Sequence, residues 1–308
     1  MAEAGFKNPG ARGVWTRRGL LAAAGGAALV LTGCGERDST KAEARRPARA
    51  DGPPEGSMAW AVAGDWRGGD RARDAARHPA ETLEFFDLAA GNEVAEFWPG
   101  AGWWTEILAP WLARNQGRLH AANFQLQPGG DPAMARIVER FRERFGGDRR
   151  LYGDISMVEF GPTSGPVAPA GSLDLALFMD NIHTWMAAGI AEKAFADAFA
   201  ALKPGGRLGV VQARADSGEV QDPAATSGYV QEAFVKQLAQ EAGFEFVAGS
   251  EVNANAEDTK DHPFGIWTLP PHRLSAPPGR PADPTFDHTP FDAIGEADRM
   301  TLKFRKPA

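Results

Sequence analysis

Short apolar runs alternate with amphipathic segments along most of this chain, and this alternation is what most restricts its fold. Runs of five to seven apolar residues predict buried strands, and the segments between them predict crossover helices. Strands joined by such helices lie parallel, because a parallel pair needs a long crossover. The strands that we expect cover residues 93–98, 118–124, 155–160, 173–179, 207–212, 244–248 and 300–304.

Apolar residues at helical spacing predict three of the helices, and glycines follow each of them. The first carries Met134 to Phe145, the second Phe195, Phe199 and Leu202, and the third Val230, Phe234, Val235 and Leu238. Residues 249–299 depart from the pattern, since eight prolines there exclude a long helix. This proline-rich excursion is either a functional lid or a surface wrap.

The N-terminal segment has the order of charges and apolar residues that is typical of an export signal. Arg12, Arg17 and Arg18 precede an uncharged stretch that ends in Leu31-Thr32-Gly33-Cys34. This ending resembles the lipobox of bacterial lipoproteins, and Thr16 to Leu21 resembles a twin-arginine signal. The alternative is an uncleaved helix with a buried thiol. The resemblance implies a signal peptide (1–33), a lipidated Cys34 with a tether (34–57) and one folded domain (58–308).

Charge and location narrow the classes of partner. The formal net charge of −7 disfavours a protein that binds the phosphates of nucleic acids. A lipidated Cys34 would hold the domain on the bilayer of the cell envelope, facing the periplasm. We therefore expect a lipid bilayer and a small-molecule or envelope substrate as partners, and no nucleic acid.

The segment Val94–Thr105 carries the most informative motif: an apolar strand ends in Glu96, and the turn Gly100-Ala101-Gly102 leads into a helix. Glycines in such a turn let the backbone pass close to a ligand. An ordinary strand-to-helix turn has the same appearance. A nicotinamide-binding reductase would carry a third glycine where Thr105 stands, so this class is disfavoured.

The same segment resembles the first motif of class I S-adenosylmethionine-dependent methyltransferases, with Trp98 in place of the usual first glycine. Later segments resemble further elements of that class in the right order, and the likeness covers about residues 60–306. It narrows to a group of predicted bacterial methyltransferases through Arg73-Asp74, Arg77-His78-Pro79 and Asn181-x-His183. The class implies a Rossmann-like seven-stranded sheet, mostly parallel with an antiparallel last strand, and helices on both faces.

The resemblance implies S-adenosylmethionine as cofactor. Asn123 stands where the class has an acid that grips the ribose, which weakens the site without abolishing it. Glu96 matches the acid that orders the glycine loop and faces the cofactor's ammonium group. The residues expected around the cofactor are Glu96, Pro99, Gly100, Ala101, Gly102, Thr105, Asn123, Phe124, Phe160 and Asp180.

His183 is the candidate general base, because it follows the fourth strand and has a usable pKa. Asn181 beside it is a candidate for orienting the nucleophile, and a loop-clamping role for His183 remains open. Arg73, Arg77 and His78 either hold an anionic substrate group or pair with Asp70 and Asp74. Asp261, His262, His272 and His288 match no standard ligand spacing, so no metal site is expected.

Two functions therefore stand against each other. One is a methyltransferase that acts on a small molecule or envelope component. The other is a non-catalytic ligand-binding lipoprotein on a methyltransferase-like scaffold, favoured by Trp98, Asn123 and a compartment with no obvious supply of the cofactor.

Overall fold

The computed structural model describes residues 52–277 and 279–308. The predicted signal peptide, Cys34 and all but the last six residues of the predicted tether lie outside this part of the chain. The domain boundaries, the lipidation and the location of the protein therefore stay predictions.

Seven strands form one sheet in the order β3-β2-β1-β4-β5-β7-β6. The five strands from β3 to β5 are parallel, and β7 runs antiparallel to both β5 and β6. This is the Rossmann-like sheet of class I methyltransferases, as predicted from the sequence. The strands are β1 (Glu93–Phe97), β2 (Arg118–Phe124), β3 (Ser156–Phe160), β4 (Leu173–Met179), β5 (Leu202–Ala213), β6 (Glu245–Ser250) and β7 (Arg299–Arg305).

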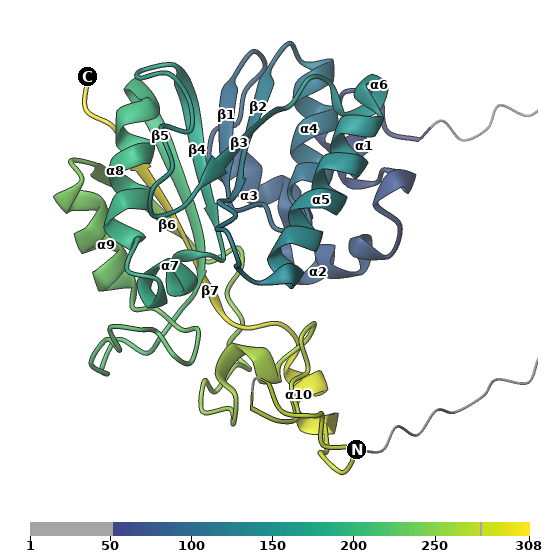
Figure 1. Cartoon of the computed structure of the whole chain (residues 1–308), viewed down its shortest axis with the longest axis vertical. Helices are drawn as coiled ribbons and strands as arrows, with labels where there is room; N and C mark the ends of the chain where they lie inside the picture. The colour runs from purple at the N-terminus through teal and green to yellow at the C-terminus, as the bar shows by residue number, and fades with distance from the viewer. Residues whose placement is uncertain (1–51, 278) are drawn as a thin grey trace, which may run out of the picture. The chain divides into compact units, whose positions relative to one another are not determined.

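Helices cover both faces of the sheet (Figure 1). One face carries α7 (Ile182–Ala187), α8 (Ala191–Ala201) and α9 (Glu232–Glu241). The other carries α1 (Met58–Val62), α3 (Pro79–Phe85), α4 (Thr105–Arg114), α5 (Pro132–Gly147) and α6 (Arg149–Tyr152). The remaining helical segments are η1 (Asp65–Arg73), α2 (Asp74–Arg77), η2 (Gly265–Thr268) and α10 (Thr289–Ile294).

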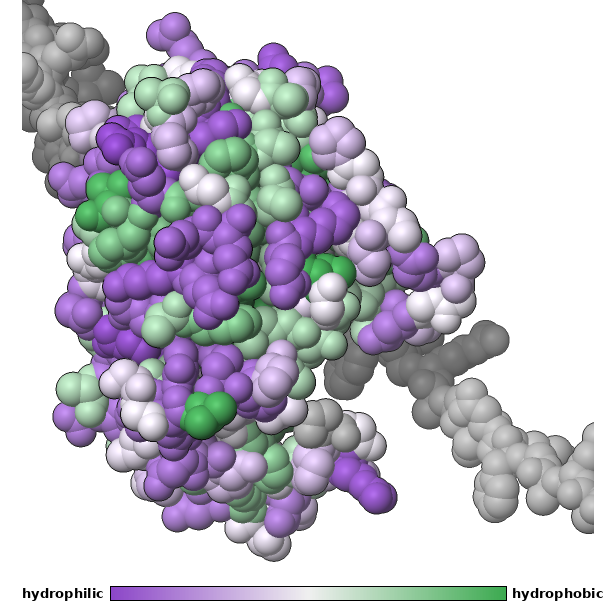
Figure 2. All heavy atoms as spheres, turned by 90° about the vertical axis from the view of Figure 1, so that its left-hand side faces the viewer, coloured by the Kyte–Doolittle hydropathy of each residue, from purple (hydrophilic) through white to green (hydrophobic). Residues whose placement is uncertain are grey.

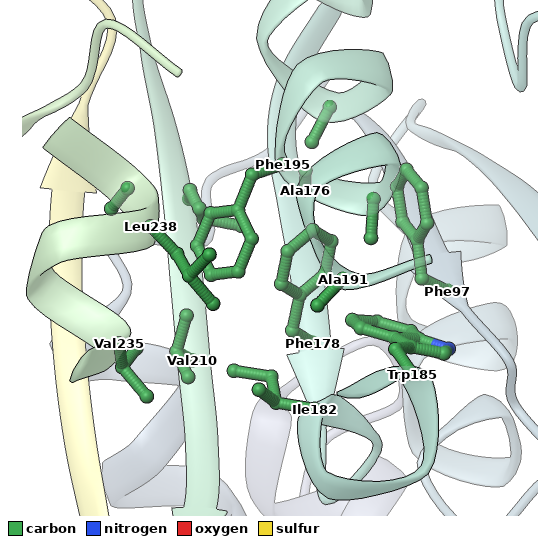
Figure 3. Close-up of a cluster of buried hydrophobic side chains, with 14 of the residues drawn as sticks. Phe97, Ala176, Phe178, Ile182, Trp185, Ala191, Phe195, Val210, Val235 and Leu238 are labelled. Carbon is green, nitrogen blue, oxygen red and sulfur yellow. The ribbon is translucent and has the colours of Figure 1, made fainter. Parts of the chain in front are cut away.

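Side chains alternate along each parallel strand, so that each strand contributes to two hydrophobic clusters. In β1, Ala95 and Phe97 pack under α7 and α8, whereas Val94 faces α4. Figure 3 shows the first cluster, in which Phe97, Phe178 and Trp185 lie together. Glu96 alternates with Phe97 and is thereby turned toward α4, into the interior.

The strand predictions are confirmed, with two corrections at helix ends. Leu202 is the first residue of β5 and not part of α8, because β5 begins directly where the helix ends. Val230 precedes α9 and instead forms an isolated bridge with Arg214. The first predicted helix, α5, ends at the predicted glycines.

Between β6 and β7, the helical segments in the described part of the proline-rich excursion are the short η2 and α10, in agreement with the sequence. The buried Asp258 stabilises this segment. Its carboxylate accepts hydrogen bonds from the Tyr229 hydroxyl and the Asp298 amide and pairs with His262. Figure 1 shows the excursion beyond the carboxyl end of β4, the end that α7 follows.

The surface is mixed in character. Figure 2 shows one face on which hydrophilic side chains separate small hydrophobic areas. Within the described ranges, no helix has the length and apolar character that crossing a membrane requires.

Candidate functional site

The candidate site lies where β1 and β4 end side by side. The chain order of the strands reverses between these two neighbours, and open α/β sheets bind ligands at such a point. The turn after β1 and the Asp180-Asn181 pair after β4 both lie there. Asn181 joins them, because its Nδ2 donates to the carbonyls of Phe97 and Trp98 at 3.0 and 3.1 Å.

The two glycines of the turn after β1 have different surroundings. Both have a positive φ, +59° at Gly100 and +95° at Gly102. A Cβ on Gly102 would lie 2.3 Å from the buried ring of Phe145, so packing requires glycine there. A Cβ on Gly100 would meet no atom within 4 Å. Open space therefore adjoins the backbone at Gly100, with Pro99 half-buried and Ala101 exposed beside it.

Glu96 is 1% exposed, and among the described residues its one side-chain hydrogen bond is from the Thr105 hydroxyl at 2.6 Å. Burial raises the pKa of this carboxyl to about 7, and the Thr105 hydrogen bond opposes the shift. The pair ties the end of β1 to the first turn of α4, which fixes the glycine turn between them.

Trp98 occupies the side of the turn that faces β2 and β3. Its indole packs against Phe124 and Phe160, with ring centroids 4.9 and 6.2 Å apart, and its Nε1 donates to the Phe160 carbonyl at 2.8 Å. Asn123 is 4% exposed; its Oδ1 accepts from the Phe124 amide, and its Nδ2 lies 3.4 Å from the Gly100 carbonyl. The structure thus brings together the residues expected around the cofactor, with their polar groups directed largely at one another.

A cavity of about 260 Å³ lies between the end of β4 and the proline-rich excursion, and Asp180, the neighbour of the turn-binding Asn181, lines it. It draws its lining from five separate parts of the chain. The lining residues are Arg77, Asp180, His183, Thr184, Ala213, Ile266, Trp267, Pro270, Pro271, His272, Ala297 and Arg299. The excursion is therefore a wall of this cavity.

Charged side chains line one side of the cavity. Glu296 accepts from Arg73 at 2.9 Å, from Arg77 at 2.7 Å and from Arg299 at 2.8 Å. Arg299 also donates to Asp180 at 2.8 Å. Although burial alone would raise the pKa of Glu296, the three guanidinium groups hold it at about 2.

These contacts correct one alternative from the sequence. Arg73 and Arg77 pair with Glu296 across 223 and 219 residues, rather than with Asp70 and Asp74. Asp74 instead pairs with Arg67 at 2.6 Å. Sequence spacing favoured near neighbours, but α2 faces the residues that lead into β7.

His183 lies 8% exposed on the cavity wall. Burial lowers the pKa of its imidazole, which is thus neutral at neutral pH; the nearby Asp180 opposes this shift. The Gln212 amide is oriented by two bonds, since its Oε1 accepts from the Ile182 amide and its Nε2 donates to the Gly228 carbonyl.

The Gln212 Nε2 also lies 3.2 Å from His183 Nδ1, closer than the Oε1 at 3.4 Å. If Nδ1 accepts from the Gln212 Nε2, the ring proton is on Nε2; if Nδ1 donates to the Gln212 Oε1, Nε2 is an acceptor. The first tautomer offers a hydrogen-bond donor to a ligand, and the second offers the acceptor that a general base needs.

The site contains residues that the sequence did not single out, namely Gln212, Trp267, Glu296 and Arg299. None has a motif of its own; the clue was that a proline-rich segment precedes the last strand. Across the described residues, no group of three or more metal-ligating side chains is found.

Comparison with known proteins gives a likeness of fold. No family model matches the chain, and no curated protein does. Solved structures that resemble it include a methyltransferase dependent on S-adenosylmethionine from Aquifex aeolicus (17% identity, 59% of this chain and 87% of that chain, TM-score 0.46). Another is 1,6-didemethyltoxoflavin-N1-methyltransferase from Burkholderia thailandensis with bound S-adenosylhomocysteine (16%, 79% and 83%, TM-score 0.41).

A third is an arsenic(III) S-adenosylmethionine methyltransferase from Chlamydomonas reinhardtii (14% identity, 77% of this chain and 73% of that chain, TM-score 0.43). Identities this low describe a shared fold alone. The activity of this chain must be argued from its own residues.

Proposed function

We propose that this protein is an S-adenosylmethionine-dependent methyltransferase that acts on a small molecule. The observation that carries the proposal is the open backbone at Gly100. It lies at the point where the strand order reverses, with Glu96 and Asn123 beside it. An open glycine at a positive φ lets a ligand lie against the main chain, and its place where the strand order reverses distinguishes Gly100 from other open glycines such as Gly171.

The residues around this backbone fit the cofactor in part. Gly100 offers it open space, and the Glu96 carboxyl stands behind the turn to balance a positive charge. When bound, S-adenosylmethionine supplies a methyl group on a sulfonium sulfur. The chain's own part is to place the acceptor in line with it, which is mainly a matter of positioning.

The cavity beside the turn is the place for that acceptor. Asn181 contacts the turn, and Asp180 and His183 on either side of it line the cavity. In the tautomer that carries the ring proton on Nε2, His183 would donate a hydrogen bond that orients the acceptor. Asn181 holds the ends of β1 and β4 together through its Nδ2, which fixes the position of the turn relative to the cavity.

Calorimetric titration of the purified full chain with S-adenosylhomocysteine tests the proposal. We expect saturable binding with a Kd of about 1 to 100 μM, and none of NAD. Gly100→Ala should weaken binding at least tenfold, because its methyl group enters the open space. Gly171→Ala is the matched control, since Gly171 has a φ of +61° and equally open surroundings but precedes β4 at its other end.

A second candidate function is a ligand-binding protein that transfers no methyl group. Trp98 favours it, because the indole covers Phe124 and Phe160, two of the residues expected to contact the cofactor. Wild-type protein that leaves S-adenosylhomocysteine unbound, together with a Trp98→Ala variant that binds it, would establish this candidate instead of the first.

The envelope location is part of the proposal and is supported by the Leu31-Thr32-Gly33-Cys34 sequence. Cells fed labelled palmitate should incorporate the label into the wild-type protein and not into Cys34→Ser. Equal labelling of both proteins would contradict lipidation at this cysteine.

A further inference from the structure

Only one nitrogen of the Arg77 guanidinium group, Nε, donates a hydrogen bond among the described residues. Its Nε donates to Glu296 at 2.7 Å, and its guanidinium carbon lies 5.1 Å from the centre of the Trp103 ring. Nη2 is 3.9 Å from Asp180, which is beyond hydrogen-bond distance. Among the described residues, no acceptor lies within hydrogen-bond reach of either terminal nitrogen.

These terminal nitrogens belong to a residue that lines the cavity, and its side chain is only 12% exposed. Neither nitrogen is among the fully buried atoms that lack a hydrogen-bond partner, so both are accessible from the cavity and available to a ligand. Burial and the neighbouring Arg299 lower the pKa of Arg77 to about 10, although Asp180 and Glu296 oppose the shift. The surroundings therefore compensate this positive charge only incompletely.

The balance of charges around the cavity is a second indication that an anion binds there. Of the charged groups that line the cavity, the guanidinium groups of Arg77 and Arg299 face one carboxylate, that of Asp180, which leaves one positive charge in excess. A bound anion would neutralise this excess.

We propose that the cavity binds a small acceptor carrying a carboxylate or phosphate group, and that the two terminal nitrogens of Arg77 hold this group. The planar fork of arginine matches the oxygens of such anions, and stacking on Trp103 together with the Glu296 bond fixes its orientation in advance. Assigning the cavity to the methyl acceptor rests on the proposed function, whereas the anion site itself does not.

The size of the cavity limits the ligand. Its volume of about 260 Å³ lies just below the range of roughly 300–1,000 Å³ that is usual for small-molecule sites. The acceptor is accordingly a small organic acid or phosphate ester. His183 also lines the cavity, and in the tautomer that carries the ring proton on Nε2 it donates to the same ligand.

Titration of the purified full chain with inorganic phosphate, and separately with acetate, in a chloride-poor buffer tests the proposal. We expect one saturable site for at least one of the two anions, with a Kd of about 1 mM. Arg77→Gln should weaken it at least tenfold, and Arg77→Lys, which keeps the charge but loses the fork, several-fold.

Arg73→Gln is the matched control. Arg73 donates to the same carboxylate as Arg77 but does not line the cavity, so anion binding should stay within about threefold of wild type. Should Arg77→Gln fail to fold by circular dichroism, the Arg77→Lys variant carries the test. Absence of a saturable site in the wild type, or an equal loss in the Arg73 variant, would overturn the proposal.

A titration with S-adenosylhomocysteine separates the two sources of a carboxylate. Its affinity should be the same in wild type and Arg77→Gln; a parallel loss would show that Arg77 holds the cofactor's own carboxylate, against the proposal. Anion binding through Arg77 in a protein that does not bind S-adenosylhomocysteine would refute the proposed function and leave the anion site standing.

Discussion

Glu96 and Glu296 are both buried carboxyl groups at the candidate site, yet their environments shift their pKa values in opposite directions. Glu96 has a single hydroxyl partner, and burial raises its pKa to about 7. Glu296 has three arginine partners, which outweigh its burial and hold its pKa at about 2. The region of the glycine turn thus lacks a positive charge, and the region of the cavity has one too many.

The difference indicates what each region is suited to bind. A carboxyl group without a cation next to it favours a ligand with a positive charge, such as the ammonium group of an amino acid. Arginines in excess over carboxylates favour an anion. Two complementary sites side by side suit a protein that brings two ligands together.

Breaking the cavity network should have the largest effect. Glu296→Gln leaves Arg73, Arg77 and Arg299 close together without their shared carboxylate, which should lower the free energy of unfolding by about 4 kcal/mol. Urea denaturation at pH 7 measures this value. A loss below about 1 kcal/mol would mean that the three arginines do not depend on Glu296.

The opposite result is expected for Glu96→Gln. Because the folded pKa of Glu96 lies above its ordinary value of 4.5, its contribution to stability is complete below pH 4.5 and is lost as the pH rises through 7. At pH 8 the loss amounts to about 3 kcal/mol, from 1.36 kcal/mol per pKa unit.

Glu96→Gln should therefore be more stable than wild type at pH 8 by up to that amount, and about equal at pH 4.5. Urea denaturation of both proteins at the two pH values gives the difference. It isolates Glu96 from Glu106, whose pKa burial also raises, to about 8, with a contribution from Asp70. Equal stability of the two proteins at pH 8 would show that Glu96 is ionised without cost.

The two glycines of the turn can be tested separately, because Gly102 packs against Phe145 and Gly100 adjoins open space. Gly102→Ala should cost about 2 kcal/mol more than Gly100→Ala, because only the former drives a methyl group into Phe145. Both pay the strain of a positive φ. Thermal unfolding of the two variants gives the comparison, and equal losses would place Gly100 in a packed environment as well.

The smallest effect concerns His183. If its Nε2 donates to the anion, His183→Ala should weaken phosphate binding about fivefold, on the order of 1 kcal/mol, and His183→Gln should restore most of it. Calorimetric titration of both variants decides this. Equal weakening by Gln and Ala would remove the donor role.

Most of the fold could be predicted because local sequence patterns determine its strands and helices. The apolar runs of β1, β2 and β4 have the length of strands, and the glycines after α5 mark its end. The end of α8 was misplaced at Leu202, since a leucine suits either a helix face or a buried strand and only the sheet pairing decides.

Only the part of the site at the end of one strand, β1, could be predicted from the sequence. Glu96, Gly100 and Thr105 lie within ten residues and form a recognisable order. The cavity joins Arg77, His183 and Arg299, which no spacing connects, so only the folded chain brings them together. The proline-rich excursion left two alternatives open for the same reason, because composition does not reveal which surface a loop covers.

The pairing of Arg73 and Arg77 with Glu296 also bears on the order in which the protein is built. The glycine turn closes a loop of nine residues between Glu96 and Thr105, whereas the arginine cluster closes loops of more than two hundred. Contacts so distant along the chain form slowly and wait for the last strand. A chain that stops short of residue 296 would lack the anion site, because it contains neither Glu296 nor Arg299.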